Sequence, residues 1–325
     1  KIQFKNMKKL LLVIATFSFV FTLNAQDETA PAADTNADEI SPWTREGLFN
    51  ISISQTALIN WAAGGQNSYS GNALLKYSAN YKKGLWKWKN DIVLGYGGLA
   101  QGDIPWQKTD DRLELNSKVI RNSAEESDWA YSAFLNFRTQ FMDGFKLPND
   151  SNIISTWMAP GYLTFGLGMD YSPNEFFSAN ISPVAGKFTF VSNTNLANAG
   201  AFGVTAAVYD EVTGEKISDG EAFRFELGGH ISMQFKKEIV KNVELDTKLN
   251  LFSNYLEEPG NIDVNWDLLL NMKVNEWLSA SLICNLIYDH DIDIALDDNN
   301  DGVLEGSGPR TQFKEVLGVG INMKF

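Results

Sequence analysis

Histidine and cysteine, two residue types that often serve in acid–base and nucleophilic catalysis, are rare in this chain. The sequence contains two histidines, His230 and His290, and a single cysteine, Cys284. His230 lies four residues after Glu226 on the polar side of an alternating segment, and a lipid hydrolase would need a serine beside such an imidazole. His290 lies in an acidic loop, and no nucleophile-elbow motif accompanies either histidine. We therefore expect no catalytic residues, and a lipid-acting enzyme that uses His230 is kept as the third functional alternative.

Metal binding is the second kind of chemistry that the residue types suggest. In DDNNDGVLE at 297–305, Asp297, Asn299 and Asp301 occupy positions one, three and five of a calcium loop, with Gly302 at position six. Gly308 stands where such a loop needs its bidentate acidic residue. We expect a solvated acidic loop without a metal or other cofactor, and calcium at this loop is the alternative.

A larger set of charged residues shares the polar side of many alternating segments. Acidic and basic residues are mixed in this set. The mixture favours ion pairs between strands over a selective pore lined by charges of one sign. We predict that these residues line an enclosed polar lumen: Lys87, Lys89, Asp91, Arg112, Glu114, Lys118, Arg138, Arg224, Glu226, His230, Glu244, Asp246, Lys248, Asp263 and Asp267.

The elements that position these residues are predicted to be β-strands. Polar and apolar residues alternate with a period of two along most of the chain. No segment after the N-terminal apolar stretch at 10–23 keeps a helical period. In the segment 223–227, for example, apolar residues at the odd positions alternate with Arg224 and Glu226. About twelve such runs can be counted, and the last is GVGINMKF at 318–325.

The connections between these runs alternate in length. Short connections are predicted at 82–84, 122–127, 172–175, 237–242 and 275–276, and longer ones at 60–68, 98–110, 143–156, 189–221 and 289–311. The connection at 257–261 is an exception. Short turns at one end and long loops at the other are typical of outer-membrane barrels. The sequence therefore predicts an all-β fold, a transmembrane antiparallel up-and-down β-barrel of about 12 strands with both termini in the periplasm.

Aromatic residues gather near the predicted strand ends, as in the interfacial girdles of membrane barrels. We predict a girdle at the periplasmic rim from Trp86, Trp88, Trp129, Tyr171, Trp277 and Phe325. A sheet in lipid must close on itself, so the last strand is expected to pair with the first, near residues 48–58. Phe325 also resembles the C-terminal aromatic residue that outer-membrane barrels present to the barrel assembly machinery.

The N-terminal part of the chain has a different character. Residues 1–25 are predicted to be upstream residues plus a signal peptide that starts at Met7 and is cleaved near Ala25. Residues 26–42 are predicted to be an acidic disordered leader, and 43–325 the barrel. The formal net charge of −13 argues against nucleic acid as a partner, and the lone cysteine excludes an internal disulfide.

Several stretches resemble a known protein family. SQTALINWAAGGQNSYSGNALLKYSANYKKG begins at Ser54 and APGYLTFGLGMDYSPN begins at Ala159. The most specific parts are Asn60-Trp61 with Gly64-Gly65, and residues 159–162. The chain is similar, over roughly 43–325, to uncharacterised Bacteroidota proteins catalogued as domain of unknown function 3078. The resemblance implies a barrel in the outer membrane of a Gram-negative bacterium, and it implies no activity.

The polar lumen and the strand number lead to the first functional expectation. A barrel of about twelve strands is wider than an eight-stranded barrel filled by side chains and narrower than a general porin. We expect a narrow, partly occluded polar conduit for small solutes, surrounded by outer-membrane lipids. The alternative is a structural or partner-binding barrel that acts through its extracellular loops.

Overall fold

The computed structural model describes residues 41–57, 66–125, 127–145, 151–296 and 306–324. The predicted signal peptide and nearly all of the predicted leader lie outside these ranges, as do Phe325 and the proposed calcium ligands Asp297, Asn299 and Asp301. Among the described residues, none of the helices combines the length and apolar character that a membrane-spanning helix needs.

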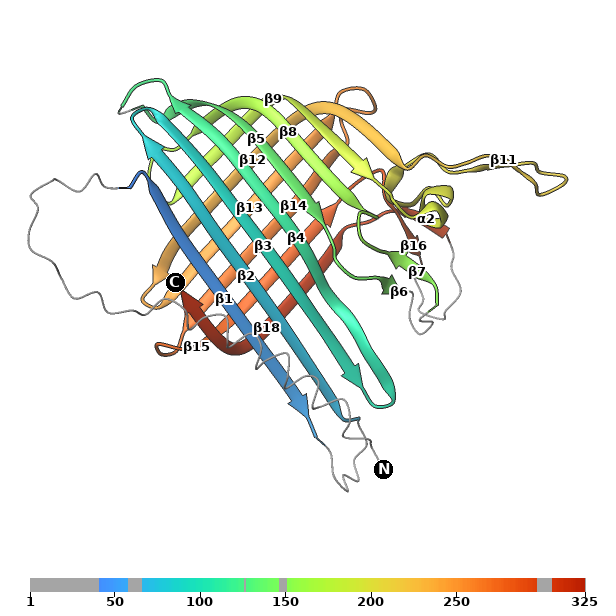
Figure 1. The fold of residues 1–325 in the computed structure, drawn as a ribbon, viewed down its shortest axis with the longest axis horizontal. Helices are drawn as coiled ribbons and strands as arrows, with labels where there is room; N and C mark the ends of the chain where they lie inside the picture. Colours follow the sequence, from blue (N-terminus) through green and yellow to red (C-terminus); the bar gives the residue numbers. More distant parts are fainter. Residues whose placement is uncertain (1–40, 58–65, 126, 146–150, 297–305, 325) are drawn as a thin grey trace, which may run out of the picture. The chain divides into compact units, whose positions relative to one another are not determined.

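Twelve antiparallel strands form one closed barrel, which confirms the predicted fold class and strand number. Each strand pairs with the barrel strands that precede and follow it in the chain, and the last pairs with the first, so the topology is up-and-down (Figure 1). The strands are β1 (Trp43–Thr56), β2 (Ser68–Lys83), β3 (Trp86–Gln101), β4 (Ile104–Asn122), β5 (Trp129–Thr139), β8 (Gly161–Tyr171), β9 (Phe177–Phe190), β12 (Phe223–Val240), β13 (Val243–Asn254), β14 (Ile262–Lys273), β15 (Leu278–Tyr288) and β18 (Gln312–Lys324).

The connections at one end of the barrel contain small elements of their own, and this end is called the long-loop end. The elements are β6 (Gly144–Phe145), β7 (Ile153–Ser155), α2 (Thr194–Asn198), the 3₁₀ turn η1 (Ala201–Gly203), β10 (Val208–Tyr209), β11 (Lys216–Ser218), β16 (Asp293–Leu296) and β17 (Gly306–Pro309). The opposite, short-turn end holds the start of β1, the end of β18 and the brief turns between strand pairs (Figure 1).

One predicted long connection is wrong. Residues 98–110 do not form a loop, because β3 runs to Gln101 and β4 starts at Ile104. The pairing of these two long strands is irregular at Gly97–Gly98 and between Leu99 and Gln101, as is common where strands contain glycine. At Gly98, a Cβ atom would lie 2.1 Å from the ring of Trp106, so only glycine lets this ring lie flat on the strand.

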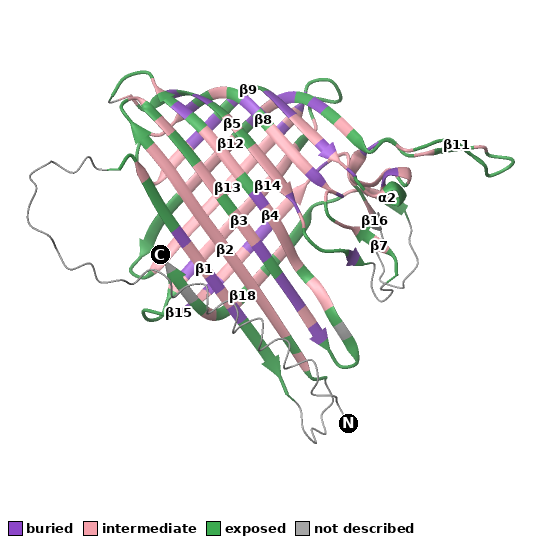
Figure 2. Ribbon diagram, in the orientation of Figure 1, coloured by how far each residue is buried: buried purple, intermediate pink, exposed green. Residues whose placement is uncertain are grey.

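The two faces of the barrel wall differ sharply in polarity. On β5, for example, Ala130 and Ser132 are buried on the lumen side, whereas Tyr131 and Leu135 on the outer side are 59% and 44% exposed. Buried positions also alternate with more exposed ones in the first half of β12, whereas much of the wall is intermediate in exposure (Figure 2). A continuous outer surface of large apolar residues is suited to acyl chains rather than to water.

Aromatic side chains contact one another at the short-turn end. The ring centroids of Trp43 and Tyr81 lie 5.3 Å apart, those of Trp43 and Trp88 lie 5.8 Å apart, and those of Trp129 and Tyr171 lie 4.7 Å apart. The outer-face residues Trp86 and Trp277 are also exposed near this end. This arrangement places amphipathic rings where the headgroups of a bilayer would lie.

The seam between the first and last strands is only partly paired. The register joins Leu48–Ser52 of β1 to Gly320–Lys324 of β18, within the predicted range. Among the described residues, Ile53–Thr56 pair only with β2, and Gln312–Val319 pair only with β15. Backbone groups on the unpaired edges must find water or another partner, because an unsatisfied group in lipid costs several kcal/mol.

Hydrogen exchange should reveal this difference along β18. In vesicles, we expect alternate amides of Gln312–Val319 to exchange much faster than those of Gly320–Met323, since the former face an edge without a strand partner. Amides of β15, which is paired on both sides, are the control. Equal protection along the whole of β18 would contradict the partly open seam.

Candidate functional site in the charged lumen

Charged side chains from opposite walls meet at mid-height in the lumen. Arg112 of β4 lies 2.8 Å from Glu114 of the same strand and 3.1 Å from Asp267 of β14. In the closed strand order β4 and β14 stand opposite each other, so the side chains of Arg112 and Asp267 together cross the barrel. Five of the six residues of this central charge layer belong to the predicted lumen set; the layer is Lys76, Arg112, Glu114, Asp246, Lys248 and Asp267.

The other contacts of the central charge layer also join distant strands. Lys76 of β2 lies 3.0 Å from Asp246 of β13, and Lys248 of β13 lies 3.8 Å from Glu114. Amide side chains support the carboxylates: Asn116 and Asn136 donate to Glu114, Gln234 donates to Asp246 and Asn285 donates to Asp267. The lumen is therefore crossed by hydrogen-bonded ion pairs rather than filled by apolar side chains.

A second polar cluster lies nearer the short-turn end. Lys118 contacts Asp170 at 2.8 Å, and Asn180 donates to both Asp170 and Ser132. His230 is almost buried, and its ring centroid lies 4.7 Å from that of Phe134. Its Nδ1 atom has no hydrogen-bond partner among the described residues.

The remaining predicted lumen residues are distributed over the same inner face. Asp91 accepts a hydrogen bond from Ser78, and Lys87 and Lys89 share its side of β3. Glu244 lies 3.9 Å from Lys236 near the short-turn end. Arg138 is half-buried on the inner side of β5.

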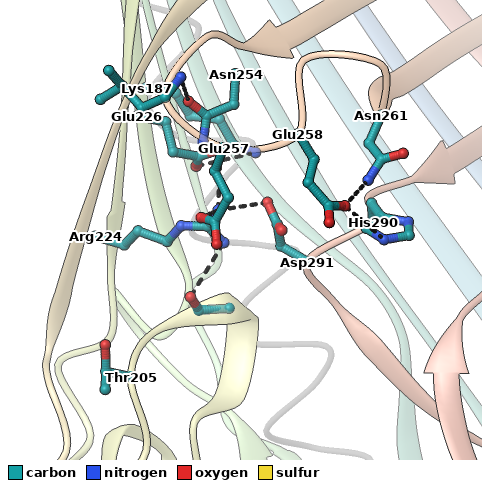
Figure 3. Close-up of polar contacts among 12 residues, drawn as sticks. Lys187, Thr205, Arg224, Glu226, Asn254, Glu257, Glu258, Asn261, His290 and Asp291 are labelled. Carbon is teal, nitrogen blue, oxygen red and sulfur yellow. Dashed lines mark hydrogen bonds and ion pairs between the residues drawn. The ribbon is translucent and has the colours of Figure 1, made fainter.

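At the long-loop end, the barrel contains an acidic pocket of about 220 Å³. Figure 3 shows its side chains converging from the wall and from the segments after β13 and β15. The lining residues are Glu226, Asn254, Glu257, Glu258, Asn261, Asp263, His290 and Asp291. All the lining side chains are acidic, amide or imidazole groups, so the pocket suits a cationic ligand.

Two cationic residues stand at the wall of this pocket. Lys187 of β9 lies 2.7 Å from Asp263, 3.1 Å from Asp289 and 3.5 Å from Glu226. Arg224 of β12 lies 2.6 Å from Asp291, with Glu257 and Glu226 at 3.5 Å and 3.6 Å. Figure 3 shows Glu226 between these two cations.

Several residues of the site were missed from the sequence. Lys76 follows the polar alternation of β2, so the same signal could have found it. Lys187 lies beyond a bulge around Pro183, where the pairing with both neighbouring strands shifts and the alternation is interrupted. Asp289 lies just past the end of β15, where alternation gives no orientation.

The closed sheet, the apolar outer face and the charged lumen together define a class of protein. In lipid, only a closed barrel can pair all the backbone groups of spanning strands, and a polar interior with an apolar exterior distinguishes such barrels. The protein is a transmembrane β-barrel of the outer-membrane type.

Comparison with known proteins places the chain near uncharacterised relatives. The family described as "Protein of unknown function (DUF3078)" matches residues 53–145, which supports the resemblance over this part of the chain. No curated protein matches the sequence. The Bacteroidota origin stays a prediction.

The solved structures that match this chain are distant in sequence. The COG4313 outer membrane channel from Pseudomonas putida F1 is 11% identical, with 91% of this chain and 100% of that chain covered and a TM-score of 0.38. The NanC porin is 9% identical, with 85% and 98% covered and a TM-score of 0.33. OprB from Pseudomonas putida is 9% identical, with 87% and 94% covered and a TM-score of 0.26.

Proposed function

We propose that this protein is a narrow conduit for small polar solutes in the outer membrane of a Gram-negative bacterium. The observation that carries the proposal is the central charge layer, where ion pairs cross a polar lumen. The long-loop end would face the outside of the cell and the short-turn end the periplasm, as is usual for such barrels. Outer-membrane lipids and the barrel assembly machinery are the expected partners.

The exposure of the central charge layer supports passage through it. The side chains of Lys76 and Lys248 are 28% and 29% exposed to solvent, and that of Asp267 is 20% exposed. The side chains of Lys76 and Lys248 keep contact with water, so their ion pairs can exchange partners more readily than the buried contact of Arg112 with Glu114. A small polar solute could therefore replace one member of a pair without a large cost.

The long-loop end favours a second candidate function, a barrel that binds a protein partner. Ala159, Val191, Ala197 and Val204 form a small buried cluster beneath the connection after β9. The β10–β11 hairpin then projects from this base with exposed Val208, Tyr209, Val212 and Ile217. Backbone amides of Thr213 and Val212 donate to Asp210 and lower the pKa of its carboxyl group, which helps to order the hairpin turn.

We propose that the barrel acts without catalysis. The side chain that a lipid-acting enzyme would need, His230, packs against Phe134 and lies deep in the lumen. Lipid hydrolysis by the purified protein that disappears on His230→Ala substitution would restore the enzyme alternative.

Single-channel recording in planar bilayers tests the conduit directly. We expect a small conductance for the unmodified protein and a larger one for the double variant Lys76→Ala/Asp246→Ala. This variant removes both members of one crossing pair, so neither is left as an unpaired charge.

The matched control is Lys216→Ala/Asp219→Ala, which removes an exposed ion pair on the β10–β11 hairpin. It should leave the conductance unchanged, because this pair lies outside the lumen. If neither the unmodified protein nor the lumen variant conducts, the conduit is refuted and the partner-binding function is favoured.

A further inference from the structure

Three carboxylates at the acidic pocket are arranged as ligands of one ion. Asp263, Asp289 and Asp291 each offer an oxygen atom, and these atoms all lie within 4.8 Å of one another. Asp263 is the second residue of β14, and the other two lie in the turn after β15. The backbone amide of Asp291 donates to the Asp289 carboxylate at 3.0 Å, which holds the two acids in one local geometry.

Glu226 supplies an independent sign of a ligand at this place. Its side chain lines the pocket, yet the residue is only 1% exposed. Its Oε1 atom accepts no hydrogen bond among the described residues and lies 3.6 Å from Arg224, while its Oε2 atom lies 3.5 Å from Lys187. A buried carboxylate is costly unless it is paired and hydrogen-bonded, so this group is poised for a closer cation.

Among the described residues, the ionised groups that contact one another at the pocket do not balance in charge. Lys187 and Arg224 supply two positive charges, against four carboxylates on Glu226, Asp263, Asp289 and Asp291. Glu257 and Glu258 add further negative charge at the exposed rim. The deficit of two positive charges among the inner groups corresponds to one divalent cation.

We propose that the acidic pocket binds a divalent cation, with calcium as the best fit, through Asp263, Asp289 and Asp291, and with Glu226 facing it. Calcium takes six to eight oxygen ligands at 2.3–2.6 Å in flexible geometry, so oxygens up to about 5 Å apart can share it. Asn254 and Asn261, whose side chains carry amide oxygens, line the same pocket. An oxygen-rich set of this kind favours a hard cation over a transition metal.

Lys187 competes with calcium for the same carboxylates, and this competition determines the calcium affinity that we expect. Its ammonium group already bonds to Asp263 and Asp289, so the ion must share these ligands with a fixed positive charge. We expect a Kd of about 10⁻⁴–10⁻³ M, the range of extracellular calcium modules. The site does not depend on the proposed conduit, because binding can be measured whether or not the barrel conducts.

Isothermal titration calorimetry of the full chain in detergent with calcium chloride tests the site. We expect the double variant Asp263→Asn/Asp291→Asn to weaken calcium binding about tenfold or more, since two charged ligands become neutral. Glu211→Gln changes an exposed acid of the β10–β11 hairpin outside the pocket and should leave the affinity unchanged. Absence of calcium binding to the unmodified protein at millimolar concentration would overturn the proposal.

Two further variants distinguish calcium bound in the acidic pocket from calcium bound elsewhere on the chain. Lys187→Met removes the competing charge, so it should raise the calcium affinity and make thermal stability depend on added calcium. Asp297→Asn/Asp301→Asn changes the acidic segment 297–305, which lies outside the described residues. Binding that is lost in this last variant but retained in Asp263→Asn/Asp291→Asn would assign the ion to that segment and refute the pocket site.

Discussion

Replacement of Arg112 by methionine is expected to lower the free energy of unfolding of the barrel by about 3 kcal/mol, the lower end of the range for a broken buried ion pair. Arg112 forms ion pairs with both Glu114 and Asp267, and Glu114 is only 6% exposed. Without Arg112, the nearest cation to Glu114 is Lys248 at 3.8 Å. Asn116 and Asn136 continue to donate to Glu114, which keeps the loss from being larger.

Urea unfolding of the barrel in vesicles, followed by tryptophan fluorescence, measures this effect. Arg112→Lys keeps the positive charge and should cost less than Arg112→Met. The double variant Arg112→Met/Glu114→Gln should recover part of the lost stability. A neutral amide at position 114 does not need the positive charge that Arg112 supplied. An unfolding midpoint of Arg112→Met equal to that of the unmodified protein would show that the crossing contact contributes nothing to stability.

Replacement of Leu135 by arginine is expected to destabilise the barrel in vesicles by about 2–4 kcal/mol, the cost of a cationic residue at the bilayer midplane. Leu135 lies near the middle of β5, on the outer face, and is 44% exposed. In a soluble protein, an arginine at an exposed position would change the stability little, because its charge would remain hydrated.

The matched control is Tyr131→Arg on the same face of the same strand. Tyr131 is 59% exposed and lies close to the short-turn end, where an arginine near the headgroups should cost only about 0–1 kcal/mol. If the two substitutions destabilised the barrel equally, Leu135 would not lie deeper in the bilayer than Tyr131, and the proposed membrane position of β5 would be wrong. Equilibrium unfolding in vesicles reports both variants under one condition.

The wall of the barrel could be predicted from local patterns. A strand turns successive side chains to opposite faces, so residues such as Arg224 and Glu226 alternate with phenylalanines whatever the rest of the chain does. The same alternation predicted a lumen side for Arg112 and Asp267. Strand number also follows locally, because each run ends in a turn, and closure was expected because two fully open edges would leave many backbone groups unpaired in lipid.

Patterns of the same kind failed where alternation is interrupted. A long connection was predicted at 98–110, but Gly98 and Gly102 lie where two extended strands accommodate bulges and the ring of Trp106. The bulge around Pro183 hid the orientation of Lys187, which proved to be the central cation of the acidic pocket. In both cases, tertiary packing decided what the local signal meant.

By itself, the sequence determined which face of the wall a side chain belongs to wherever the alternation is regular, because that choice depends only on neighbours one residue apart. Only the tertiary structure decided which lumen residues meet. Arg112 and Asp267 are 155 residues apart in the chain, and Lys187 and Asp289 are 102 apart. Such contacts depend on the registers between all the intervening strands and on the closure of the barrel, which together set the height and the angle at which each side chain enters the lumen.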